Sequence, residues 1–156
     1  MNQIAPYLSR LPPALRRATL LWDSWRDVPG VTPPFSRMQL GEITDLGLAV
    51  SISETLRTDP DRDVEDFVVI YLSPRVRGLG LDKAEGKRLS ERPHTRPGSP
   101  TFEASRAAVQ SGMAQFFDAS GDKGILGYRS LLGVALPLRG NKGATDFAMT
   151  VVDFEL

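Results

Sequence analysis

This chain of 156 residues has its strand-forming segments in two separate groups, and this arrangement most constrains the fold that it can adopt. In the first group, Leu48, Val50 and Ile52 alternate with small or polar residues, and residues 67–72 form an unbroken β-branched and aromatic run. Alternation of period two predicts a half-buried strand, and the unbroken run is typical of a central strand. The link between them, residues 58–63, is rich in turn-forming residues, so we expect a hairpin with a long loop.

The second group of strands occupies the last third of the chain. We expect strands at residues 113–117, 128–138 and 147–154, with a glycine-rich turn at residues 140–143. One face of the middle strand carries alternating residues, namely Tyr128, Ser130, Leu132, Val134, Leu136 and Leu138. Between the two groups, residues 73–112 predict short helices, because Ser73-Pro74 and Ser99-Pro100 each place a capping hydroxyl before a first-turn proline. Strands in two runs around one helical block indicate an α+β fold.

An amphipathic helix is predicted ahead of the strands, and it begins near Pro12 and Pro13. Its apolar residues recur at spacings of three and four, forming one stripe: Leu11, Leu15, Ala18, Trp22 and Trp25. Such a stripe packs on its own domain in most proteins, but two tryptophans on a narrow seam leave a dimer interface as the alternative. We therefore divide the chain into residues 1–34, the helix and its linker, and residues 35–156, the domain.

The composition excludes several kinds of site. The chain has no cysteine, which rules out disulfides, thiolate metal sites and flavin–cysteinyl adducts. Its single histidine, His94, lies between prolines, where no helix or strand would hold an imidazole over a haem iron. We expect no metal site and no haem.

Charge and hydropathy argue against nucleic acid and membrane. Basic and acidic residues balance at 19 each, so the electrostatic footprint of a nucleic-acid binder is missing. Basic residues still gather in the middle of the chain: Arg75, Arg77, Lys83, Lys87, Arg88, Arg92, Arg96 and Arg106. We interpret them as a solvated face, with contact to an acidic partner or a phosphate-bearing ligand as the alternative. No apolar run approaches the roughly 20 residues of a membrane helix, and no targeting signal is present, so a cytoplasmic location is expected.

The order of the predicted elements resembles a PAS domain: two strands, a block of short helices, then three strands in one five-stranded antiparallel sheet. The motifs that carry the resemblance are the helix with Leu21 and Trp25 and the strand 67–72 followed by Gly80, Asp82, Gly86 and Leu89. The segment 136–138, the turn 140–143 and the strand 151–154 complete them. In these features the chain looks like the short, stand-alone PAS-like proteins of alphaproteobacteria.

The resemblance implies a non-catalytic sensory or protein-interaction module. Such a module would be dimeric and would act through a partner such as a kinase or regulator. The module would bind either a small apolar ligand, in a pocket between the sheet and the helices, or no ligand at all. We expect the walls of this pocket to come from apolar side chains: Tyr71, Val109, Met113, Leu132, Val134, Phe147 and Met149. The alternative is a small α+β enzyme of the isomerase or dehydratase kind that uses Asp146 or Tyr128 as a buried acid or base.

Overall fold

The computed structural model describes residues 10–57, 63–76, 84–120, 130–140 and 145–155. Along the chain, its elements are α2 (Pro13–Ser24), η1 (Phe35–Arg37), α3 (Leu40–Thr44), β1 (Ala49–Leu56), β2 (Asp66–Leu72), α4 (Pro74–Val76), η4 (Leu89–Glu91), α5 (Pro100–Ser111), β3 (Gln115–Asp118), β4 (Ser130–Arg139) and β5 (Thr145–Glu155). The predicted α+β order of two strands, a helical block and three strands is confirmed.

The five strands form one antiparallel sheet in the order β2-β1-β5-β4-β3. β1 and β2 pair as the predicted hairpin, with a register shift between Ile52 and Ser53. β5 then inserts between β1 and β4, so that Val151 pairs with both Val50 and Val134. The first and last strands of the sheet in sequence are therefore neighbours at its centre.

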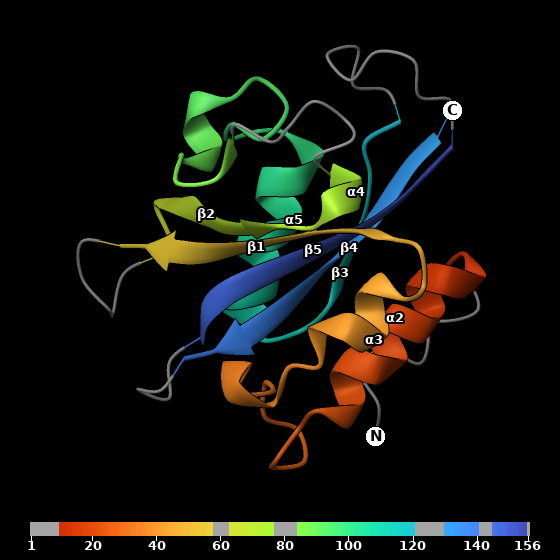
Figure 1. The fold of residues 1–156 in the computed structure, drawn as a ribbon. Helices are drawn as coiled ribbons and strands as arrows, with labels where there is room; N and C mark the ends of the chain where they lie inside the picture. The colour runs from red at the N-terminus through yellow and green to blue at the C-terminus, as the bar shows by residue number, and fades with distance from the viewer. Residues whose placement is uncertain (1–9, 58–62, 77–83, 121–129, 141–144, 156) are drawn as a thin grey trace.

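Helices cover both faces of the sheet (Figure 1). On one face, α2 and α3 pack against the side chains that alternate along the three central strands, namely Val50, Ile52, Val134, Leu136, Leu138, Met149 and Val151. On the opposite face, η4 and α5 pack against the strand residues that alternate with this first set, such as Ala49, Ala135 and Ala148. Because side chains alternate across a strand, central strands enclosed by two helical layers must be apolar on both faces.

α2 is an integral part of the core. Its predicted stripe faces the sheet, and Leu15, Ala18 and Trp22 are 0% exposed. The indole N–H of Trp22 donates a hydrogen bond of 2.7 Å to the main-chain carbonyl of Pro137 in β4. The stripe of Leu11, Leu15, Ala18, Trp22 and Trp25 is thus covered by the chain's own sheet, and this corrects its alternative assignment as a dimer interface.

α5 begins and ends as its sequence predicts. The hydroxyl of Ser99 accepts a hydrogen bond from the Phe102 N–H, and Pro100 occupies the first helical position. Gly112 ends the helix in the left-handed conformation, with φ of 73°. The buried face carries small residues at Ala104, Ser105 and Ala108, which allow the helix to lie close to β3, β4 and β5.

Residues 25–34, which we call the strap, connect the two helical layers. Arg139 at the end of β4 donates hydrogen bonds to the Asp27 carboxylate and to the main-chain carbonyl of Thr32. The Thr32 hydroxyl in turn donates to the carbonyl of Gly112, at the end of α5, over 3.3 Å. The predicted boundary between residues 34 and 35 is therefore crossed by main-chain and side-chain contacts, including the bridge between Pro34 and Arg139.

Candidate functional site

The predicted walls of an apolar pocket do not lie together. Tyr71, Leu132, Val134, Phe147 and Met149 all belong to the core under α2 and α3. Val109 lies across the sheet, in the core under α5 and η4, while Met113 is half-buried beyond the end of α5. The sheet itself separates these two sets, so the assignment of all of them to one pocket is corrected. The physical reason is that both faces of the central strands are apolar, and sequence alternation cannot tell which helix covers which face.

Hydroxyl groups interrupt the apolar core on the α5 face of the sheet. Ser51 in β1 and Thr150 in β5 are cross-strand partners, and their hydroxyls share a hydrogen bond. Ser105 on the buried face of α5 is 1% exposed, and its Oγ has no hydrogen-bond partner among the described residues. A buried hydroxyl without a partner costs about 1–3 kcal/mol of desolvation, so this layer is polar where an ordinary core would be apolar.

A cavity of about 440 Å³ opens beside the first turn of α5. The segment that enters the helix forms one wall, and the end of β3 forms the other. Its lining residues are Pro93, Arg96, Pro97, Gly98, Ser99, Pro100, Asp118 and Ala119. This volume lies within the roughly 300–1,000 Å³ of small-molecule sites in proteins.

A tight turn builds the first wall. The N–H of Ser99 donates to the carbonyl of Arg96 over 3.0 Å, and Gly98 between them has φ of 94°. Proline at the second position and a glycine with positive φ at the third define a type II turn, whose geometry both residue types favour. Upstream, the hydroxyl of Thr95 donates to the Leu89 carbonyl over 2.8 Å and anchors the segment to η4. The wall is therefore held at both ends.

The end of β3 builds the second wall. Asp118 pairs with Leu132 of β4, and the N–H of Ala119 donates to the Leu131 carbonyl over 2.9 Å. The Asp118 carboxylate accepts a hydrogen bond of 2.8 Å from the main-chain N–H of Ser120. Hydrogen bonds from the side chain and the main chain of Ser120 lower the pKa of Asp118 below its ordinary value of 3.8, so this carboxylate is ionised at neutral pH.

Sequence reasoning did not identify this cavity as a site. In the sequence, Arg96 is one of several basic residues in the middle of the chain, and no motif distinguishes Asp118. The Pro97-Gly98 pair between Arg96 and Ser99 is the signal that could have predicted the turn. Nothing in the sequence, however, indicates that this turn faces the end of β3, because the whole of α5 separates the two segments along the chain.

Two other predicted functional groups stay untested. Tyr128 lies outside the described residues, and of Asp146 the structure describes only its main-chain place in β5. The enzyme alternative therefore remains a prediction. His94 lies half-buried in the turn between η4 and α5, outside any helix or strand. Among the described residues, no group of three or more His, Asp or Glu side chains is placed to hold a metal ion.

Comparisons with known proteins place the fold. No family model and no curated protein matches the chain. Among solved structures, a sensory box sensor histidine kinase from Vibrio cholerae is similar, with a TM-score of 0.55 and 16% sequence identity over 78% of this chain and 93% of that one. The fold is therefore PAS-like, as the element order predicts. No helix in the part of the chain that the structure describes has the length and hydropathy needed to cross a membrane.

Proposed function

We propose that this chain is a non-catalytic sensory or protein-interaction module of PAS type that acts through a separate signalling protein. The observation that carries the proposal is the sheet order β2-β1-β5-β4-β3 with α5 packed across β3, β4 and β5. The similar fold of a sensory box histidine kinase supports a kinase or a regulator as the partner. The proposal takes the chain to act in the cytoplasm, and its narrower likeness to alphaproteobacterial proteins remains a prediction.

The proposed interaction with a kinase or regulator can be tested with the full chain. A two-hybrid screen against the kinases and response regulators of the source genome would name candidates, and the purified kinase would then be assayed for autophosphorylation with and without the chain. We expect the rate to change at equimolar chain, and an unrelated kinase from the same genome to be unaffected. If no kinase or regulator binds, or if the rate stays constant, the proposed signalling role is wrong.

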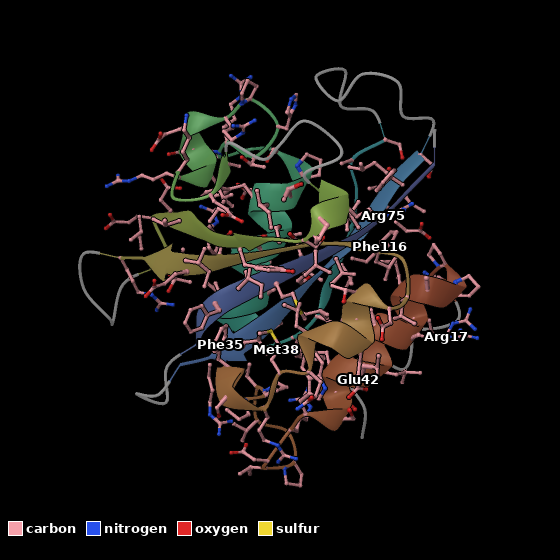
Figure 2. The ribbon with its side chains drawn as sticks, in the orientation of Figure 1. Arg17, Phe35, Met38, Glu42, Arg75 and Phe116 are labelled. Carbon is pink, nitrogen blue, oxygen red and sulfur yellow. The ribbon has the colours of Figure 1, made fainter. Side chains whose placement is uncertain are left out.

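Homodimer formation belongs to the same proposal but needs a surface other than the stripe. The large apolar side chains exposed among the described residues are Leu20, Val28, Val31, Ile70 and Phe116. Phe116 is 46% exposed on the edge strand β3 and is labelled in Figure 2. Size-exclusion chromatography with light scattering on the full chain should give twice the chain mass. A single-chain mass at every concentration would rule the homodimer out.

A further inference from the structure

Two residues of opposite charge are among those that line the cavity beside α5. Arg96 lines it from the turn, and Asp118 lines it from the end of β3. These two side chains form no ion pair with one another, and the guanidinium of Arg96 has no partner among the described residues. Main-chain hydrogen bonds hold the backbone of both walls in place without a ligand, and the Asp118 carboxylate also accepts from the N–H of Ser120.

Two main-chain N–H groups beside the cavity already have hydrogen-bond partners. The Ser99 hydroxyl already accepts from the N–H of Phe102, and the Glu103 carboxylate accepts from the N–H of Gly98 over 3.0 Å. An anion alone would thus meet Arg96 but also the carboxylate of Asp118, and a cation alone would meet Arg96 as a repelling charge. A ligand that carries both charges can satisfy both walls.

The remaining lining indicates an aliphatic portion on that ligand. Pro93, Pro97 and Pro100 also line the cavity, and proline has an apolar ring and no main-chain N–H to donate. A guanidinium binds a carboxylate through two parallel hydrogen bonds, and an ionised carboxylate accepts readily from an ammonium group. The lining therefore combines one position for each charge with an apolar wall.

We propose that this cavity binds a small zwitterion, a molecule with one carboxylate and one ammonium group such as a free aliphatic amino acid. Arg96 would hold the carboxylate, Asp118 the ammonium group, and the prolines the aliphatic part. The inference rests on the proposed sensory function in one respect, since the zwitterion would be the signal that the module senses. Binding itself requires no partner protein.

Isothermal titration of the full chain tests this with leucine and two analogues that each lack one charge. Isocaproate keeps the carboxylate and the branched chain of leucine, whereas isoamylamine keeps the ammonium group and the same chain. γ-Aminobutyrate would serve as a second zwitterion with a wider separation of charges. We expect saturable binding of at least one zwitterion, and binding of each single-charge analogue about tenfold weaker or more, because each loses one charge-assisted hydrogen-bonded pair.

Matched variants distinguish a loss of binding at this cavity from the effect of changing the protein's net charge. Arg96→Gln and Asp118→Asn should each weaken the binding of the zwitterion about tenfold or more. Arg17→Gln on α2 and Glu42→Gln on α3 make the same changes of charge at exposed positions among the helices of the other layer, and they should leave binding unchanged (Figure 2). An NMR fingerprint of each variant would verify that it is folded.

The proposal is overturned if no zwitterion binds at millimolar concentrations, or if binding survives in both Arg96→Gln and Asp118→Asn. Binding of isocaproate equal to that of leucine would instead define an anion site and would also reject it. These outcomes are independent of the kinase assay: a chain that alters kinase activity without binding any zwitterion keeps the proposed function and loses only this ligand.

Discussion

Gly133 lies in the middle of the buried strand β4, and its cross-strand neighbour leaves no room for a side chain there. Phe117 of β3 is its partner in the register, and a Cβ atom added at Gly133 would lie 2.4 Å from the Cζ atom of the Phe117 ring. The ring thus covers the bare main chain of β4. Phe117 is 6% exposed, so it cannot move aside without disturbing the core under α5.

We expect Gly133→Ala to lower the free energy of unfolding by about 1–3 kcal/mol, the usual cost of overpacking a core. Urea denaturation would measure it. Gly41→Ala in α3 is the matched control, because a Cβ there has nothing within 4 Å, and it should be neutral or stabilising by up to about 1 kcal/mol. Equal effects at both positions would mean that the Phe117 ring does not restrict Gly133.

Two carboxylates should make the protein less stable in acid. The hydrogen bond from Arg139 lowers the pKa of Asp27, and the hydrogen bonds from Ser120 lower the pKa of Asp118, both from an ordinary value of 3.8. A carboxyl whose pKa is lower in the folded state binds fewer protons there than in the unfolded state. Its contribution to stability is therefore present above about pH 4 and is lost as the pH falls through the lowered pKa.

Urea denaturation at a series of pH values between neutral and strongly acidic would check this expectation. The midpoint of the wild-type chain should fall below about pH 4. The variant Asp27→Asn, which cannot ionise at that position, should show a smaller fall over the same interval, and Asp118→Asn likewise. A wild-type midpoint that stays constant through this interval would contradict the expected linkage.

Among the elements, α2 has the clearest consequence for the boundaries of the domain. It supplies Leu15 and Trp22, both 0% exposed, to the same core as the central strands. A chain of residues 35–156 would expose the apolar side chains of Val134, Leu136 and Met149 that α2 covers. We expect this fragment to lack a cooperative thermal transition in circular dichroism and to aggregate in size-exclusion chromatography. A sharp transition near that of the full chain would instead support the division at residue 34.

Most elements were predictable because their signals are local, but the sequence did not predict η1 and α3. The three- and four-residue spacing from Leu11 to Trp25 predicted α2, and the Ser99-Pro100 pair predicted the beginning of α5. The boundaries differ little: β3 runs Gln115–Asp118, two residues beyond the predicted start at 113. Helix caps and strand periodicity are encoded in neighbouring residues, so they need no knowledge of the tertiary structure.

The assignment of side chains to faces was not predictable in the same way. β4 is buried almost throughout, so Leu132 and Leu131 look equally suited to either layer. Only the packing of α2 on one side and α5 on the other decides which residue meets which helix. The cavity beside α5 has the same origin, because Arg96 and Asp118 meet through tertiary structure alone.

For the whole molecule, the strap makes the two helical layers interdependent. The Thr32 hydroxyl contacts the carbonyl at the end of α5, while Trp25 at the other end of the strap belongs to the core under α2. Arg139 fastens the middle of the strap to β4. The strap, which follows α2 directly in the chain, therefore links α2 to the end of α5 and to β4 by contacts that lie outside the sheet ladder.

The central place of β5 also governs when the protein can fold during its synthesis on the ribosome. β5 is the last of the five strands to be translated, yet it joins β1 to β4 in the finished sheet. Until it has emerged, the hairpin of β1 and β2 and the pair of β3 and β4 have no common sheet, and their apolar faces are exposed to other chains. Exposed apolar surface and unpaired strand edges favour aggregation, so we expect the protein to be most prone to aggregate at this nascent stage.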